Sequence, residues 1–389
     1  MTRVLIAGVS TRAAADSAAR AGFDVTSLDG YADRDQHPGV RALALPRDLG
    51  LEFTAHNAAA AAAAIPCDAV TYLSNFENDP AAVAALASNR RLWGNPPDVL
   101  QRTRDPFVVE ATFRAHGVAV PGVSNANAPN DPNDPNEWLL KPLSSGGGHG
   151  IRPWRRTAVP GGWYLQQKIE GPAGSIVFVA ANGHAVPLGV SRQLIGDHRF
   201  GIGGVRYCGN ILAPWADPQF NDGAELMTAA HHLAAIAADE FQLVGVNGID
   251  FIDRSGVPYP IELNPRWSAS MELIERSLGV SVFAAHAASC TQGELPDAPG
   301  LPDRAVGKAI VFALDSCVAG DTDAWLADAD IRDVPHAGDP IAAGSPVCTV
   351  LADAADAASC ESALVERAQR IYADMRGWPL KSAAPISHF

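Results

Sequence analysis

Several features that mark large protein classes are missing from this sequence. None of its apolar runs reaches the ~18 residues that a transmembrane helix needs. Lys and Arg number 29 against 43 Asp and Glu, and the formal net charge is −14. This balance argues against a nucleic-acid partner and against docking on an anionic membrane. The first apolar stretch is too short for a signal peptide, so we expect a cytoplasmic protein.

Cysteine pairs are also missing. The six cysteines are scattered, and none stands in a C-x-x-C pair, so the sequence predicts neither a disulfide framework nor a zinc site. They read as small apolar residues in or near cores.

Lysine is scarce as well. Only four of the 29 basic residues are lysines, and arginine serves almost everywhere else. A lysine that is kept beside a glycine-rich segment, as Lys141 is, therefore suggests a chemical reason.

The opening of the chain has an alternating pattern of strands and helices. Apolar strands are expected at 3–10, 23–28 and 69–74, with helices at 11–21 and 57–65, which predicts a parallel sheet covered by helices. The first loop, GVSTR, lacks the G-x-G-x-x-G of dinucleotide sites, which disfavours a dehydrogenase. Ser10 and Arg12 lie where strand ends face a ligand crevice, although Ser10 or Thr11 could simply cap the helix.

The rest of the chain divides at WGNPP, residues 93–97. A helix is expected at 106–116, and the Asn/Pro/Asp-rich segment 125–136 must be an exposed loop. Strands follow at 138–142, 163–169 and 175–179, the last forming a hairpin with 184–190. A helix at 222–240, paired strands at 244–252 and 257–263, and a helix at 270–277 come next. From about 301 we expect a small third domain with a helix at 360–375.

A glycine-rich loop after Lys141 is the first candidate site. Consecutive glycines let backbone N–H groups converge on an anion, and the preceding lysine would reach phosphate oxygens. No Gly-Lys-Ser/Thr closes it, so it is not a P-loop, and a flexible hairpin tip is the alternative. The loop residues are Ser144, Ser145, Gly146, Gly147, Gly148 and His149.

A strand that ends in polar residues is the second candidate site. The segment YLQQKIEGPAG, from Tyr164, turns at Gly171-Pro172, where backbone groups could meet the edge of an adenine. An ordinary strand and turn is the alternative.

Two acidic strands form the most specific signal. Glu262 and Asn264 share one face of a strand because side chains alternate along it, and hairpin pairing brings Asp250 opposite them. Two carboxylates and an amide oxygen suit Mg²⁺ shared with phosphates. Arg266 follows, placed to contact a transferred phosphoryl group.

The sequence resembles the ATP-grasp fold in the order of these segments. Lys141 and the glycine-rich loop come first, then the strand and turn from Tyr164, then Asp250, and last the E-x-N-P-R strand that begins at Glu262. That family includes D-alanine–D-alanine ligase, biotin carboxylase and carboxylate–amine ligases. The resemblance implies an α/β protein, with α+β structure in the clamp. It implies a Rossmann-like domain at 1–95, a two-lobed ATP-grasp domain at 96–300 and a small C-terminal domain at 301–389. The stretches from Asn264 and Arg332 are similar to the biotin-carboxylase-related branch, including predicted carboligases of methanofuran and tetrahydromethanopterin metabolism.

Family roles then fall on matching positions. Lys141 would bind phosphates, and the adenine would be framed by Gln166, Gln167, Lys168 and Ile169. Where many relatives have a ribose-binding glutamate, this chain has Ala173, Gly174 and Ser175, so the residue that binds the ribose stays open. Ser175 is a candidate for nucleotide contact. Either Arg102 or Arg104 would replace an earlier ATP-binding lysine. The substrate candidates are Ser10, Arg12, Arg192, Arg206 and Ser268. Arg192 and Arg206 could grip a substrate carboxylate, and the alternative for these two is that they are simply exposed to solvent.

The resemblance implies an ATP-dependent ligase that joins a carboxylate, through an acyl phosphate, to an amine. ATP and Mg²⁺ or Mn²⁺ would be the cofactors, and a small-molecule acid and amine the partners; a dimer is the commonest state among relatives. A carboxylase that uses carboxyphosphate, and a nucleotide-binding module without turnover, are the alternatives.

Overall fold

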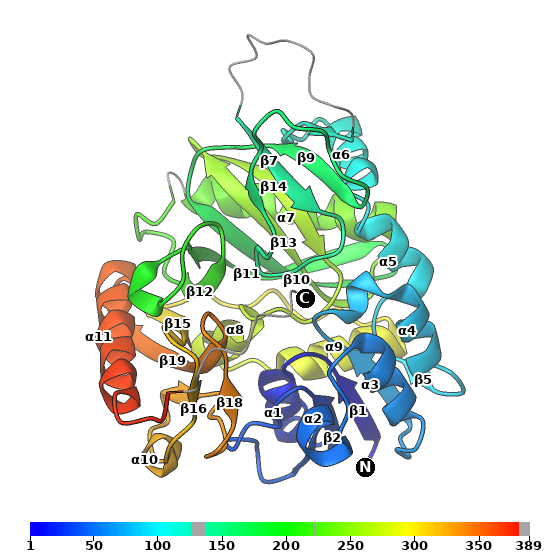
Figure 1. Ribbon diagram of the computed structural model, residues 1–389. Coiled ribbons are helices and arrows are strands. Elements are labelled where there is room, and N and C mark those ends of the chain that lie inside the picture. Colours follow the sequence, from blue (N-terminus) through cyan, green and yellow to red (C-terminus); the bar gives the residue numbers. More distant parts are fainter. Residues whose placement is uncertain (126–136, 221–222, 381–389) are drawn as a thin grey trace.

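The computed structural model describes residues 1–125, 137–220 and 223–380. All but the first residue of the loop expected at 125–136 lie outside these ranges. Figure 1 shows two lower bodies, one from each end of the chain, beneath a two-lobed upper part. None of the helices described is both long and apolar enough to cross a membrane.

The amino-terminal domain is a five-stranded parallel sheet with the order β3-β2-β1-β4-β5. Val4 and Ile6 of β1 pack on one face, and Leu5 and Ala7 pack on the other. The expected parallel sheet with helices on both faces is therefore confirmed. Its elements are β1 (Arg3–Ala7), α1 (Arg12–Arg20), β2 (Asp24–Asp29), β3 (Val40–Ala44), α2 (Leu45–Leu49), α3 (Ala55–Ala62), β4 (Ala69–Tyr72), η1 (Phe76–Asn78), α4 (Pro80–Leu86), β5 (Arg91–Leu92) and α5 (Pro97–Thr103).

The small lobe of the upper part is a four-stranded antiparallel sheet with the order β6-β9-β7-β8. Strand β7 (Trp138–Pro142) has the bounds that its apolar run predicts. The other elements are α6 (Pro106–Ala115), β6 (Val123–Ser124), β8 (Arg152–Pro153) and β9 (Trp163–Gln167).

The large lobe is built on a hairpin that the sequence predicts. Strands β10 (Ala173–Ala181) and β11 (His184–Ile195) pair across Asn182 and Gly183, whose φ angles of 53° and 75° suit Asn-Gly in a tight hairpin turn. Helix α7 (Gly223–Phe241) packs on one face of this sheet, and α8 (Met271–Leu278) and α9 (Val282–Gln292) on the other. The remaining elements are η2 (His198–Phe200), β12 (Tyr207–Leu212), β13 (Gly245–Arg254) and β14 (Val257–Asn264).

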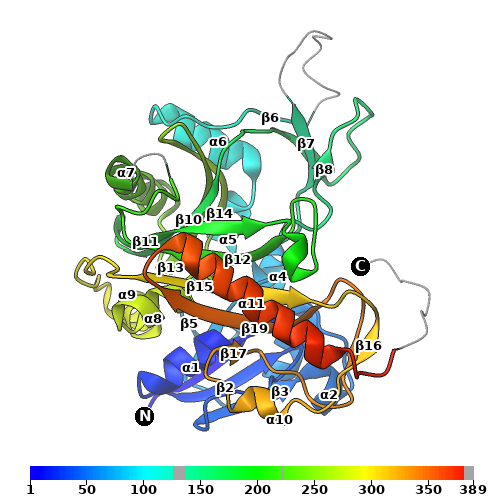
Figure 2. The same cartoon turned by 90° about the vertical axis from the view of Figure 1, so that its left-hand side faces the viewer.

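The carboxyl-terminal strands extend this same sheet. Its order is β14-β13-β10-β11-β12-β15-β19-β17, and β15 (Ala305–Phe312) pairs with β12. Helix α11 (Ala357–Met375) lies along β15 and β19, as Figure 2 shows. The boundary expected near 300 stays a prediction, but strands on its two sides share one sheet. The other elements are β16 (Cys317–Val318), α10 (Asp323–Leu326), β17 (Ile331–Arg332), β18 (Pro340–Ile341) and β19 (Pro346–Ala354).

Candidate active site

A cavity lies where the small lobe faces β14. It has about 660 Å³ of empty space, part of it open to solvent. The small-lobe sheet, the glycine-rich loop, the α5–α6 connection and β14 all contribute to its wall. The charged and amide residues that line it are Arg104, Glu110, Lys141, Gln166 and Glu262.

Lys141 is buried on the cavity side of the small-lobe sheet. Its Nζ donates to Oε1 of Gln166 at 2.9 Å and lies 5.8 Å from the centroid of the Tyr164 ring. Gln166 Nε2 in turn donates to the carbonyl oxygen of Ile261 on β14, at 3.2 Å. A buried ammonium without a carboxylate partner is costly, so this geometry suits an anion in the cavity.

The glycine-rich loop rests against the segment before β12. The carbonyl oxygen of Gly147 accepts a hydrogen bond from the backbone N–H of Tyr207. Gly148 has a φ of +79°, and a Cβ there would lie 2.1 Å from the carbonyl oxygen of Val205. The close approach and the positive φ therefore both require glycine at 148. Ser144 and His149 are exposed, whereas Ser145 and Gly146 line the cavity.

Arg104 joins the loop to the acidic strands. Its Nη1 is paired with Glu262, and its Nη2 donates to the carbonyl oxygen of Ser145 at 2.9 Å. Arg102 points elsewhere, to the carbonyl oxygen of Glu240 and the ring of Phe241. The structure thus brings Arg104 into the cavity and keeps Arg102 outside it.

The acidic residues meet as the hairpin pairing predicts. Asp250 of β13 stands directly opposite Glu262 of β14, and Asn264 Nδ2 donates to Oδ2 of Asp250 at 3.0 Å. Gln193 Nε2 donates to the other carboxylate oxygen, Oδ1, at 3.0 Å.

The two carboxylates differ in pKa. Burial, followed by the charge of Glu262, raises the pKa of Asp250 to about 6. Burial also acts to raise the pKa of Glu262, but Arg104 and Lys141 outweigh it and hold that pKa below its usual value. Two carboxylates this close repel each other when both are ionised. A divalent cation bound to both would offset that repulsion, so the pair suits such a cation. Among the described residues, no three His, Cys, Asp or Glu side chains are placed so that they could hold a metal ion together, so the set here is two carboxylates and one amide.

Arg266 follows directly after β14 and meets a residue of the amino-terminal domain. Its Nε and Nη2 both donate to Oε1 of Glu77, at 2.9 and 2.7 Å. Glu77 lies in η1, just beyond β4, and is 2% exposed.

Residues 104–270, which carry the residues of this site other than Glu77, match the family model described as an ATP-grasp domain. The chain contains an ATP-grasp domain. A curated relative, an uncharacterized protein of Methanocaldococcus jannaschii, is 29% identical over 115 residues, which are 29% of this chain and 27% of the relative. The aligned part is thus about a quarter of that relative.

Solved structures match the fold over almost the entire chain. A biotin carboxylase from Campylobacter jejuni has a TM-score of 0.70 at 16% identity, covering 98% of this chain and 92% of that one. An L-amino acid ligase from Bacillus licheniformis has a TM-score of 0.67 at 17% identity, covering 95% and 97%. N5-carboxyaminoimidazole ribonucleotide synthetase from Thermus thermophilus has a TM-score of 0.66 at 17% identity, covering 99% and 100%.

The predicted hinge of the ATP-grasp domain has a mixed outcome. Gln166 lines the cavity, and Ile169 is buried just after β9. The side chains of Gln167 and Lys168 bond away from the cavity residues, to the backbone N–H of Gly122 and to the carboxylates of Glu137 and Glu170. An adenine contact at 167 or 168 would therefore use the backbone.

Ser175 was expected to contact the nucleotide. The structure places it on β10 directly opposite Asp250, and its hydrogen bond lowers the pKa of that carboxyl against the stronger effect of burial. In this position Ser175 stabilises the ionised form of Asp250 through that hydrogen bond.

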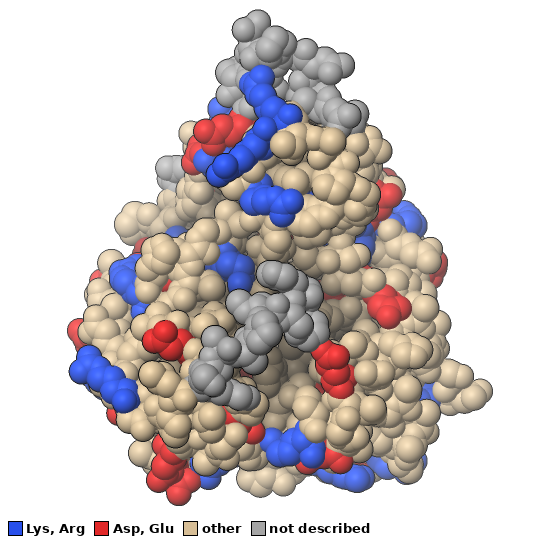
Figure 3. Space-filling model, viewed as in Figure 1, with Lys and Arg blue, Asp and Glu red and all other residues tan. Residues whose placement is uncertain are grey.

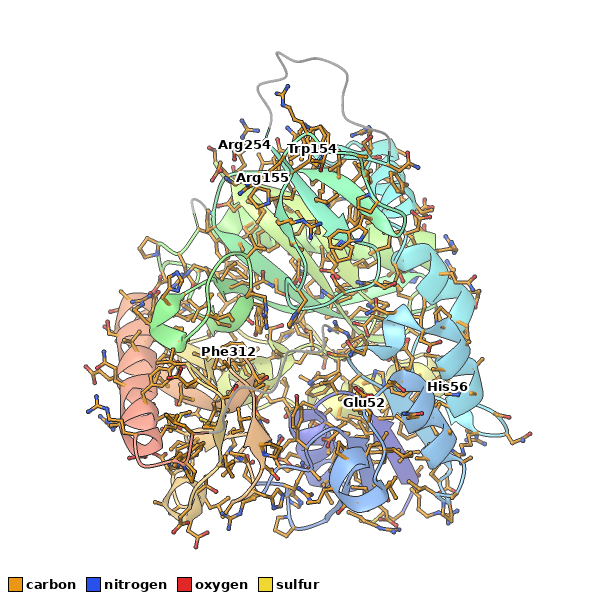
Figure 4. All side chains as sticks on the ribbon, in the orientation of Figure 1. Glu52, His56, Trp154, Arg155, Arg254 and Phe312 are labelled. Atoms are coloured by element: carbon orange, nitrogen blue, oxygen red, sulfur yellow. The ribbon has the colours of Figure 1, made fainter. Side chains whose placement is uncertain are left out.

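The two arginines expected to hold a substrate carboxylate differ in their surroundings. Arg192 Nη2 is bound to Oε2 of Glu361 on α11 at 2.6 Å. Arg206 lies over the ring of Phe312, a residue labelled in Figure 4, and its buried Nε has no hydrogen-bond partner among the described residues. Burial lowers the pKa of Arg206. Arg206 is thus the better placed of the two for an incoming anion.

The remaining substrate candidates lie apart from the cavity. Ser10 is exposed, and the hydroxyl of Ser268 lies 3.1 Å from that of Ser270 at the start of α8. Arg12 is 2% exposed and sits among four carboxylates that come from all three parts of the chain. These are Asp16, Asp35, Glu272 and Asp333.

Two residues of the site were not predicted from the sequence. Gln193 follows Arg192 on β11. Because successive side chains of a strand point to opposite faces, the sequence could have shown that the two residues face different sides of the sheet. Glu77 stands just past the carboxyl end of β4, the edge of a parallel sheet where ligand contacts gather. That position was a usable signal, but an acid there gives no hint of its partner 189 residues later.

Proposed function

We propose that this protein is an ATP-dependent ligase that joins a carboxylate to an amine through an acyl phosphate. The observation that carries the proposal is one cavity with two complementary walls. Lys141 and the glycine-rich loop stand on one side, and Glu262, beside Asp250 and Asn264, stands on the other. Similar structures support it, since they include an L-amino acid ligase and a biotin carboxylase domain in complex with MgADP and bicarbonate.

The nucleotide would lie between the lobes. Lys141 supplies a positive charge for its phosphates, and the loop from Ser145 to Gly148 supplies backbone N–H donors. Arg104 ties this loop to Glu262, so the phosphate side and the acidic side are set at a fixed distance.

Asp250, Glu262 and Asn264 would hold Mg²⁺. When bound, this cation neutralises charge on the transferring phosphoryl group. Gln193 and Ser175 orient the Asp250 carboxylate that the ion requires.

In the reaction an oxygen of the substrate carboxylate bonds to the γ-phosphorus of ATP while the bond to the bridging oxygen breaks and ADP leaves. The amine nitrogen then bonds to the acyl carbon, phosphate departs, and the amine proton passes to phosphate or solvent. Arg266 and Lys141 stabilise the negative charge on the phosphoryl group in the transition state. Arg206 would bind a carboxylate of the substrate that is not consumed.

A carboxylase is the second candidate, because the chain matches biotin carboxylases over nearly its full length. It would phosphorylate bicarbonate in place of an organic acid. ATP turnover that requires bicarbonate and no amine would favour it. For the ligase, we include glutamate and tyramine in the substrate panel, since the sequence resembles carboligases of one-carbon cofactor biosynthesis.

The test is a phosphate-release screen of amino acids, other acids and amines with Mg-ATP. Glu262→Gln is the matched control, because it keeps the size of the side chain and removes one charge from the metal set. We expect its kcat to fall roughly a hundredfold, while Mg-ADP still binds. Near-normal Mg-dependent turnover by this variant would show that the metal site is elsewhere.

A further inference from the structure

The segment that ends β14 is held by the amino-terminal domain. The carbonyl oxygen of Pro265 accepts hydrogen bonds from the hydroxyl of Tyr72 at 3.3 Å and from Nδ2 of Asn95 at 3.0 Å. The next residue, Arg266, is bound by Glu77. Three polar groups from the first 95 residues thus converge on two consecutive residues of the ATP-grasp domain.

The pairing of Arg266 with Glu77 has a specific orientation. Both Nε and Nη2 donate to the same oxygen, so Glu77 occupies one edge of the planar guanidinium group. Nη1 donates to the carbonyl oxygen of Trp267 at 3.2 Å. This arrangement fixes both the position and the rotation of the group, because a planar fork bound on two edges cannot turn.

Stability alone does not account for the pair. Both side chains are buried, with exposed fractions of 11% for Arg266 and 2% for Glu77. Oε2 of Glu77 is buried and has no hydrogen-bond partner among the described residues. Burying two charges, one of them half satisfied, often stabilises a protein less than an apolar pair of similar volume would. A role in aiming the guanidinium explains why the charges are there.

We propose that Glu77 is the positioning residue of Arg266, so that the amino-terminal domain aims the guanidinium of the ATP-grasp domain at the reacting phosphoryl group. This inference rests on the proposed function, in which Arg266 stabilises the transition state. Glu77 acts through Arg266 and does not itself touch the nucleotide.

The first experiment is a double-mutant cycle. Glu77→Gln keeps an oxygen that can accept both hydrogen bonds but removes the negative charge, so we expect kcat to fall about tenfold; Glu77→Ala removes the acceptor altogether and should fall further, towards a hundredfold. The KM for ATP should stay within about twofold, because Lys141 and the loop are untouched. In an Arg266→Ala background, Glu77→Gln should cause no further loss.

The matched control is Glu275→Gln. Glu275 of α8 also binds the amino-terminal domain, but its partners there are Nη2 of Arg20, at 2.6 Å, and the hydroxyl of Ser17. It reports what a weaker domain contact costs without any change at Arg266. We expect its kcat to remain within about twofold of the parent protein.

A crystal structure of Glu77→Ala, with Mg-ADP added, gives a readout that does not need turnover. The proposal expects the Arg266 guanidinium to leave the position that it has here. It is overturned if the group stays in place, if Glu77→Gln has normal kcat, or if the loss is equally large in the Arg266→Ala background. If no pair of acid and amine supports ATP turnover by the parent protein, the proposed function fails. The crystal structure alone then decides the positioning role. Thermal melting shows that each variant is folded.

Discussion

At the scale of single residues, the buried lysine sets the character of the cavity. Lys141 is 7% exposed, and its Nζ donates to the neutral amide of Gln166. Basic side chains also gather near the top of the molecule in Figure 3, where Figure 4 labels Arg155 of the small lobe and Arg254 at the end of β13, but these are exposed. The difference is desolvation, because a charge out of water binds an anion more strongly than one at the surface.

We therefore expect Lys141→Ala to raise the dissociation constant for Mg-ADP at least tenfold. Losing a hydrogen bond to a charged group costs roughly 1.5–3 kcal/mol. Arg254→Ala removes the same formal charge at the exposed end of β13 and should leave the affinity within about twofold. Calorimetry on both variants checks this, and equal affinities would remove Lys141 from the site.

At the scale of an element, the glycine-rich loop is shaped by contact as well as by freedom. Gly148 combines a φ of +79° with a Cβ position only 2.1 Å from the carbonyl oxygen of Val205. A Cβ on Gly146 would meet nothing within 4 Å. Two neighbouring glycines thus have different reasons to be glycine.

Gly148→Ala should prevent the loop from seating against the segment before β12. We expect ATP affinity to fall about tenfold or more, since the methyl group collides with backbone and the left-handed conformation adds roughly 1 kcal/mol. The melting temperature should change little, because the loop lies at the surface. Gly146→Ala is the control, expected to change affinity by about threefold or less; identical affinities for the two variants would contradict this account. Calorimetry and amide exchange of residues 144–150 are the measurements.

At the scale of the whole molecule, a buried histidine connects two domains. His286 of α9 accepts the backbone N–H of Val246 on β13 at its Nδ1, 3.0 Å away, and its Nε2 lies 3.3 Å from the hydroxyl of Thr71 on β4. Burial lowers the pKa of His286 to about 4. Protonation would place a donor against the donor of Val246 in a site that is 4% exposed.

The stability of the protein should therefore depend on pH through His286. Its unfolded pKa is about 6.5, so the unfolded state binds the proton first. This contribution is fully present above about pH 6.5 and is lost as pH falls towards 4, with a maximum of about 3 kcal/mol. Urea unfolding between pH 4.5 and 7.5 measures it. His286→Gln should flatten the acidic slope, and a slope unchanged in the variant would assign it to other groups.

The sequence predicted the elements near the site better than the contacts between them. Strand β7 has the predicted bounds, and the turn at Asn182-Gly183 was readable from two residues. Strands β3, β5, β6, β8 and β12, and helices α2, α4, α5, α9 and α10, were not predicted. These are short, or carry weak patterns that packing overrides.

What the sequence by itself determined is the local chemistry. Alternation along a strand and a short hairpin are enough to set Asp250 opposite Glu262, because both rules act over a few residues. Only the tertiary structure decided which of Arg102 and Arg104 enters the cavity, that Arg192 is held by Glu361, and that Glu77 binds Arg266. Each of these pairings joins residues more than 100 positions apart. No local pattern encodes such a partner, since it depends on how whole layers pack.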